Sequence, residues 1–80
     1  MNREEILSKV QLIFRNVLND ESVILKDETV ADDVEGWDSL THVQLISEIE
    51  KSFGIKFSLR EMLSWKTVGK MIDCIEKKVG

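Results

Sequence analysis

The sequence predicts an all-α domain, a small four-helix bundle with a long first loop and a short third helix. Three observations lead to this prediction. Apolar residues recur at helical spacing in four segments, no segment shows a strand pattern, and a long acidic stretch without a helical period follows the first segment. The 80 residues, 42% of them hydrophobic, suffice for one modest core, so we expect a single domain over residues 1–80.

The first helix is expected to run from the beginning of the chain to about Leu18. Asn2 and Glu5 have the spacing of a capping box, and the apolar stripe that follows consists of Ile6, Val10, Ile13, Phe14 and Val17. Residues 19–37 lack a sustained period, and Gly36 lies near their end. A loop this long is often functional. We expect its scattered apolar residues to hold it across the helices: Val23, Ile24, Leu25, Val30 and Val34.

Three more helices are expected after the loop. Asp38 is a suitable N-cap and Gly54 a suitable C-terminal residue for a helix at 39–53, whose apolar positions are Leu40, Val43, Leu45, Ile46, Ile49 and Phe53. Ser58 and Glu61 form a second capping box, which opens a brief helix with Leu59, Met62 and Leu63. Thr67 caps the last helix, and its apolar stripe consists of Val68, Met71, Ile72, Ile75 and Val79.

Negative charge is concentrated in the loop. The chain has a net charge of -4, and residues 20–38 hold eight acids against one base. This field disfavours nucleic acid and favours basic protein surfaces, although a solvated loop without a partner is the alternative. No apolar run is long enough to span a membrane, and we expect no stable membrane insertion. The charged beginning is unlike a secretory signal, and the single cysteine, Cys74, cannot form an internal disulfide, so we expect a cytoplasmic protein without a metal site.

The stretch Gly36-Trp37-Asp38-Ser39-Leu40 is the most informative part of the chain. With Asp38 as N-cap, Ser39 becomes the first helical residue, and its hydroxyl points out near the positive end of the helix dipole. A phosphodiester on that oxygen would be favoured by the dipole and by the free backbone N–H groups. On these residues alone, a simple helix cap remains the better explanation, because such caps are common.

The order of motifs along the whole chain changes this assessment. Asp38-Ser39-Leu40 is followed by Val43-x-Leu45-Ile46, by the helix exit Phe53-Gly54-Ile55, by Ser58-x-x-Glu61 and by Thr67-Val68. This set resembles the phosphopantetheine-dependent acyl carrier proteins, and the resemblance covers nearly all 80 residues. It implies one acyl carrier domain over residues 1–80. It also implies that Ser39 carries 4′-phosphopantetheine, moved from coenzyme A by a phosphopantetheinyl transferase, with Asp38 and Leu40 completing the cofactor site.

The resemblance implies a carrier rather than an enzyme. Acyl groups would travel as thioesters between acyl-loading ligases or transferases, synthases and other enzymes of fatty-acid, polyketide or related biosynthesis. We expect a monomer that docks to these partners through Leu40, Val43, Gln44, Ser47 and Glu50. Thr41, Gln44 and Lys51 stand where fatty-acid carriers usually or frequently have acids, so we expect partner surfaces that are less basic. Met62 and Met71 are candidates to line a space for an apolar chain, or ordinary core residues.

Two residues near Ser39 have open roles. His42 lies three positions later, so it can share a neighbourhood with Ser39, and a helical projection places it towards the inward edge. It either touches the phosphopantetheine arm or packs its ring at the edge of the core. Trp37 either fixes the loop against the bundle or offers an aromatic contact to partners. Trp65 is expected in the core.

The residues argue against two rival functions and leave a third open. A serine hydrolase is excluded because the chain has one histidine, no Gly-x-Ser-x-Gly elbow and too little length for a substrate site. A calcium loop starting at Asp27 would need glycine and glutamate where Asp32 and Asp38 stand. The remaining competitor is an unmodified helical protein-interaction domain of the same fold, because fold similarity alone does not prove function.

Overall fold

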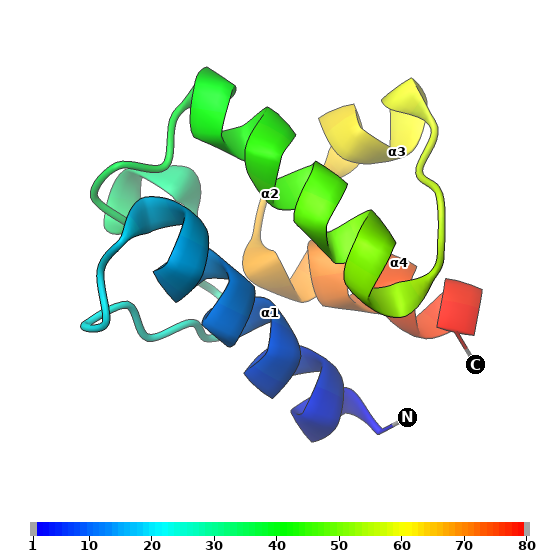
Figure 1. Ribbon diagram of the computed structural model, residues 1–80. Coiled ribbons are helices and arrows are strands. Elements are labelled where there is room, and N and C mark those ends of the chain that lie inside the picture. The colour runs from blue at the N-terminus through cyan, green and yellow to red at the C-terminus, as the bar shows by residue number, and fades with distance from the viewer. Residues whose placement is uncertain (1, 80) are drawn as a thin grey trace.

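Four α-helices account for most of the computed structural model, which describes residues 2–79. In chain order they are α1 (Arg3–Leu18), α2 (Ser39–Phe53), α3 (Leu59–Ser64) and α4 (Val68–Val79), and a short 3-10 turn, η1 (Ala31–Asp33), interrupts the loop between α1 and α2 (Figure 1). No strand occurs within these residues. The predicted all-α class, the long first loop and the short third helix are confirmed.

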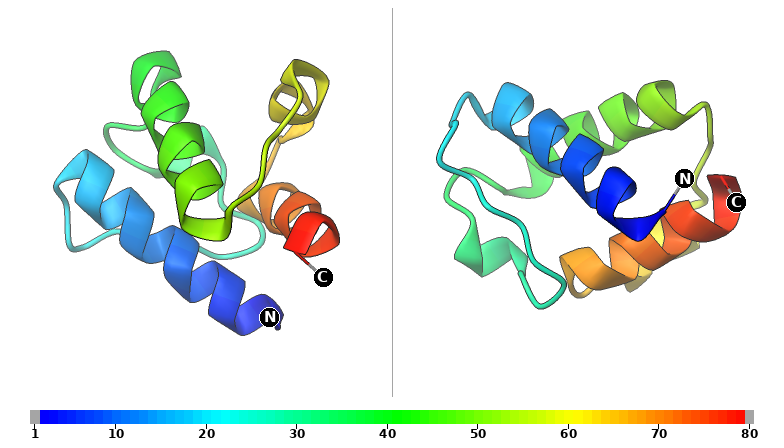
Figure 2. Two further views of the ribbon diagram at one scale, coloured as in Figure 1. Left: turned by 45° about the vertical axis from the view of Figure 1, so that its right-hand side comes forward. Right: turned by 90° about the horizontal axis from the view of Figure 1, so that it is seen from below.

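The core lies between α1, α2 and α4. Its fully buried side chains come from the predicted apolar stripes: Ile6, Val10, Phe14, Leu45, Ile49, Val68, Met71, Ile72 and Ile75. Burying a side chain of this size stabilises the fold by about 1.5–3 kcal/mol relative to leaving it in water. The first turn of α1 and the last turn of α4 lie close together in every view, whereas α2 begins at the far end of the molecule (Figures 1 and 2).

The helix ends follow the predicted caps. The Asn2 side chain accepts a hydrogen bond from the backbone N–H of Glu5 at 2.8 Å, and Thr67 accepts one from the N–H of Lys70 at 3.2 Å. Gly54 ends α2 in the left-handed conformation, with φ of 66°. Such a conformation favours glycine, because it carries no Cβ to clash with the backbone.

The long loop is held to the helices by buried apolar side chains and by backbone hydrogen bonds. Val23, Leu25 and Val34 are buried as expected, but Ile24 is 67% exposed, so the expectation that it also anchors the loop is wrong. Neighbouring residues of an extended segment point to opposite sides, and Val23 and Leu25 occupy the inward one. The loop also reaches α4, where the backbone N–H of Val68 donates to the backbone oxygen of Thr29 at 2.8 Å.

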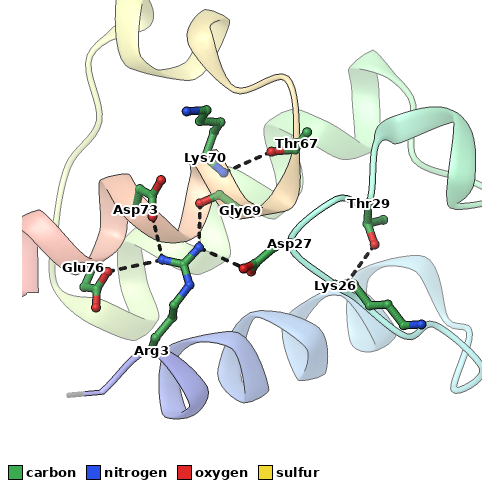
Figure 3. Close-up of polar contacts among 9 residues, drawn as sticks. All are labelled: Arg3, Lys26, Asp27, Thr29, Thr67, Gly69, Lys70, Asp73 and Glu76. Atoms are coloured by element: carbon green, nitrogen blue, oxygen red, sulfur yellow. Dashed lines mark hydrogen bonds and ion pairs between the residues drawn. The ribbon is translucent and has the colours of Figure 1, made fainter.

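Arg3 ties the beginning of α1 to α4 and to the loop. Its guanidinium donates to Asp73 at 2.6 Å, to Glu76 at 3.3 Å, to Asp27 at 3.3 Å and to the backbone oxygen of Gly69 at 3.2 Å (Figure 3). A planar fork with five N–H donors suits such a multiple contact better than an ammonium group does. The network therefore fixes three separate segments of the chain around one side chain.

Helix α3 is attached to the bundle through polar contacts of Glu61 and through Met62, which packs against the core. None of its residues is buried. Glu61 receives the N–H of Ser58 at 2.7 Å and forms an ion pair with Lys78 of α4 at 3.1 Å. These contacts lower the pKa of Glu61 to about 2, chiefly through the backbone hydrogen bond from Ser58. A single acidic side chain thus both begins α3 and fastens it to α4.

Candidate functional site

The start of α2 is fixed by a closed set of hydrogen bonds around Asp38. Its carboxylate accepts the backbone N–H groups of Leu40 and Thr41, both at 3.0 Å. The Thr41 hydroxyl accepts the Asp38 N–H at 2.8 Å and donates to the Gly36 oxygen at 2.8 Å. The hydrogen bond from Thr41 N–H is the main cause that lowers the pKa of Asp38 below its usual value. The predicted N-cap is confirmed, and it is an ionised one at neutral pH.

Ser39 is the first residue of α2 and is exposed. Within residues 2–79 neither its hydroxyl nor its backbone N–H makes a hydrogen bond, and the Asp38 carboxylate receives the N–H groups of the next two residues. The hydroxyl is therefore not needed to begin the helix. It is free to react with a group that approaches from solvent.

A cavity of about 300 Å³ opens beside Ser39 and is called the Ser39 cavity below. Its walls come from η1, from the residues before α2, from the first turn of α2 and from the α3–α4 connection: Ala31, Trp37, Asp38, Ser39, His42, Trp65 and Lys66. Trp37 and His42, whose roles the sequence left open, therefore both face the space next to the serine. Trp65, expected in the core, is only half-buried and stands on the other side of this space.

The histidine is joined to both tryptophans. The Trp37 indole N–H donates to His42 Nδ1 at 3.0 Å, and the two rings are nearly parallel with centroids 6.0 Å apart. The Trp65 ring meets His42 edge-on, with centroids 6.2 Å apart. Burial lowers the pKa of His42, so its imidazole is neutral at pH 7. Trp37 also packs edge-on against Phe14 of the core at 4.8 Å, which confirms that it fixes the loop.

A second hollow, the α2/α3 groove, has a volume of about 400 Å³. It is lined mainly by apolar residues of the two helices, namely Val43, Ile46, Leu59, Met62 and Leu63, with His42, Ser47 and Glu50 completing the wall. His42 therefore belongs to both hollows. Met62 lines the groove, whereas Met71 is fully buried in the core, so only one of the two candidate lining methionines is placed to contact a guest.

The residues expected to dock partners lie along one side of α2. Leu40 and Val43 are 78% and 66% exposed, and Gln44 and Ser47 are exposed as well. The helical period placed Leu40 and Val43 in one stripe with Ile46 and Ile49, but the buried face centres on Leu45, Ile46 and Ile49 instead.

Glu50 is half-buried, and its carboxylate accepts the backbone N–H of Phe57 at 2.8 Å. This contact holds the α2–α3 connection. The expected docking surface is thus formed mainly by apolar and neutral side chains, and the one acid in the set is engaged by the chain itself.

Sequence reasoning missed Ala31 and Lys66, which line the Ser39 cavity. Both are distant from Ser39 in the sequence, and nothing in the local pattern signals their approach. Residues 2–79 contain no group of three or more His, Cys, Asp or Glu side chains placed to hold a metal ion. Among the helices described, none is sufficiently long and apolar to cross a bilayer.

Comparison with known proteins gives consistent matches. A family model described as "Phosphopantetheine attachment site" matches residues 8–75. The acyl carrier protein of Thermotoga maritima is 40% identical over 80 residues, which cover 99% of this chain and 98% of that protein. The acyl carrier protein of Thermosynechococcus vestitus is 36% identical with the same coverage. A non-reducing polyketide synthase of Emericella nidulans is 39% identical over 72 residues, which are 89% of this chain and 3% of the synthase.

The fold agrees with these matches. The solution structure of the holo acyl carrier protein from Geobacter metallireducens superposes with a TM-score of 0.87 at 42% identity, covering 92% of this chain and 85% of that one. The family model includes the start of α2 and the whole site described above. The chain therefore belongs to the acyl carrier protein family, whose members carry acyl groups on a 4′-phosphopantetheine prosthetic group.

Proposed function

We propose that Ser39 is the residue that carries phosphopantetheine, with Asp38 and Leu40 framing the site. The observation that supports this assignment most directly is the exposed Ser39 hydroxyl, which lacks a hydrogen bond within residues 2–79 and stands at the start of α2. The Asp38 carboxylate positions it, because that side chain caps the helix and leaves the serine outside the cap. Leu40, next along the helix, is 78% exposed beside it.

Other serines fit the role less well. Three of them, Ser22, Ser58 and Ser64, use their hydroxyls in local hydrogen bonds. Three more lie within α1 or α2 beyond the first turn: Ser8, Ser47 and Ser52. A phosphodiester at those helical positions would lack the free N–H groups and the dipole that favour negative charge at a helix start.

The surroundings of Ser39 fit an attached phosphodiester. Its backbone N–H is free, and an anion at the first turn of a helix is stabilised by about 0.3–1 kcal/mol. Lys66 lines the same cavity and supplies a positive charge. Two N–H donors occupy the Asp38 carboxylate, which reduces its repulsion of a neighbouring phosphate.

The chemistry of attachment requires a separate transferase. The Ser39 oxygen would attack the β-phosphorus of coenzyme A, the pyrophosphate bond would break, and adenosine 3′,5′-bisphosphate would leave. Ser39 makes no hydrogen bond to a basic side chain within the described residues, so we expect the transferase to accept its proton. The attached group supplies a thiol that forms thioesters with acyl groups. We accordingly propose that the protein is a carrier rather than a catalyst. We further propose that residues 1–80 form one domain and that the protein acts in the cytoplasm.

The docking surface of this carrier is proposed to be the exposed side of α2, formed by Leu40, Val43, Gln44, Ser47 and Glu50. Its apolar centre favours partners with an apolar patch beside their entrance, among them the loading ligase or transferase and the synthases of fatty-acid, polyketide or related biosynthesis. Because this side of α2 holds few free acids, the partner surface is expected to be less basic than one that binds a strongly acidic helix. Loading rates should therefore fall only weakly between low and high salt.

Mass spectrometry tests the attachment. The purified chain is incubated with coenzyme A, Mg²⁺ and a broad-specificity phosphopantetheinyl transferase, and its intact mass is measured. The wild type and the control Ser47→Ala should gain the mass of one phosphopantetheine, and Ser39→Ala should gain nothing. A wild type that several transferases leave unmodified would favour the competing role, an unmodified helical interaction domain.

A further inference from the structure

Beside Ser39 lies a free hydrogen-bond donor that the attachment step does not use. His42 Nδ1 accepts the Trp37 indole N–H, so the neutral ring carries its proton on Nε2. Within residues 2–79, Nε2 makes no hydrogen bond. The ring is half-buried and lines the Ser39 cavity. A donor held in place by one partner and left without another is suited to an acceptor that arrives from outside.

The other walls of the cavity suit a chain that is partly apolar. Trp37 and Trp65 offer indole rings that both face His42, with ring centroids 6.0 and 6.2 Å from the imidazole. Pantetheine consists of short apolar segments joined by two amide groups, and each amide presents a carbonyl acceptor. The occupant of this cavity is constrained by position as well, because Ser39 itself is part of the wall. A group attached there begins inside the cavity.

We propose that the Ser39 cavity binds the pantetheine section of the attached arm, with His42 Nε2–H donating to an amide carbonyl and the indoles of Trp37 and Trp65 packing against its apolar segments. This inference rests on the proposed attachment at Ser39. His42 is a positioning residue in this arrangement, since the thioester forms at the far end of the arm.

The placement of His42 gives the contact a further consequence. The same ring lines the α2/α3 groove, where Val43, Leu59, Met62 and Leu63 form the apolar wall. Among residues 2–79, His42 is the one residue that lines both hollows. The imidazole therefore borders both the cavity where the arm begins and the groove where a cargo could lie. Binding of the arm at His42 therefore orients the cargo toward the groove instead of leaving it free in solvent.

A purely structural role for His42 predicts a different result, and an experiment can separate the two. The Trp37–His42 hydrogen bond ties the loop to α2 whether or not an arm is attached, so loss of that tie would affect the apo and holo forms equally. An arm contact acts only in the holo form. The informative quantity is therefore the change caused by attachment, compared among variants.

The test uses the wild type, His42→Gln and His42→Leu, each as apo and holo protein with loading verified by intact mass. Glutamine keeps an N–H donor close to the position of Nε2, and leucine removes it. We expect attachment to raise the Tm by a few degrees in the wild type and in His42→Gln, and by clearly less in His42→Leu, which keeps only the contacts with the two indoles. In NMR spectra of the holo wild type, we expect cross-peaks between the arm and the rings of Trp37, His42 or Trp65.

Equal apo-to-holo Tm shifts in all three proteins, together with no cross-peak between the arm and these rings, would overturn the inference. Each variant serves as its own apo reference, so a general loss of stability in His42→Leu does not obscure the comparison. Absence of the mass gain in the wild type would instead overturn the attachment at Ser39. The two failures are therefore distinguishable.

Discussion

Replacing Gly69 by alanine should have two opposing effects on stability. Helix propensity increases, but the added Cβ clashes with the long loop. Gly69 is buried near the beginning of α4, and a Cβ added there would lie 2.9 Å from the backbone oxygen of Asp27 and 3.2 Å from its Cβ. At that distance the loop must move. Two backbone hydrogen bonds depend on the position of the loop. The N–H of Gly69 donates to the backbone oxygen of Asp27 at 2.9 Å, and the N–H of Val68 donates to that of Thr29 at 2.8 Å.

The expected magnitude follows from these contacts. In a helix interior alanine is favoured over glycine by about 0.8–1 kcal/mol, and this is the upper bound for Gly69, the second residue of α4. Overpacking of a well-filled site costs about 1–3 kcal/mol. Each weakened backbone hydrogen bond costs up to about 0.5–1.5 kcal/mol. The costs exceed the gain, so we expect Gly69→Ala to lower the free energy of unfolding by about 1–3 kcal/mol. For a domain of this size the Tm should fall by roughly 5–20 °C.

Thermal unfolding followed by circular dichroism measures this change. The neighbouring Lys70→Ala is a matched control, because Lys70 is exposed on the same turn and should stay within about 0.5 kcal/mol of the wild type. A Tm of Gly69→Ala equal to or above that of the wild type would refute the reasoning. It would show that the loop yields without cost and that helix propensity dominates at this position.

Four further predictions concern charged and titratable side chains. Arg3→Ala should lower stability by about 0.5–1 kcal/mol in low salt and by less in 1 M NaCl, as measured by urea unfolding; the same loss in both would contradict an ionic origin. Glu61→Gln should lower the Tm near neutral pH. The lowered pKa of Glu61 gives stability that is present above pH 4.5 and is lost as the pH falls toward about 2, so the variant's Tm should depend less on pH in this range. An unchanged dependence of the Tm on acidic pH would count against this role. Burial lowers the pKa of His42 in the folded chain, so as the pH falls the unfolded chain protonates this histidine before the folded chain does. The free energy of unfolding should therefore decline as the pH falls below 6.5. Trp37→Phe should raise the pKa of His42 in an NMR titration, since it removes the N–H that favours the neutral ring, and an unchanged value would speak against that hydrogen bond.

Local sequence signals were sufficient for the helices and their caps. Asp38, Gly54 and the pair Ser58 and Glu61 act through hydrogen bonds within a few residues, and such contacts can be recognised from spacing alone. The position of Ser39 as the first residue of α2 follows from the same local rule. The attachment role needed more than spacing, because a capped serine by itself is common.

The cavity next to Ser39 could not be predicted in the same way. Lys66 and Trp65 reach it from the α3–α4 connection, and Ala31 reaches it from η1. Their approach depends on the packing of the long loop, which follows no period. The exposure of Ile24 likewise depends on which side of an extended segment meets the core, and the sequence offered no periodicity there to decide it.

The closed cap at the start of α2 determines what a partner enzyme can sense. Asp38, Thr41 and Gly36 complete the hydrogen bonds of the first turn without the Ser39 hydroxyl. The backbone of α2 should therefore be the same before and after modification. Enzymes that discriminate loaded from unloaded carrier must recognise the arm and the side chains around it, because the helix to which they dock presents the same outline in both states.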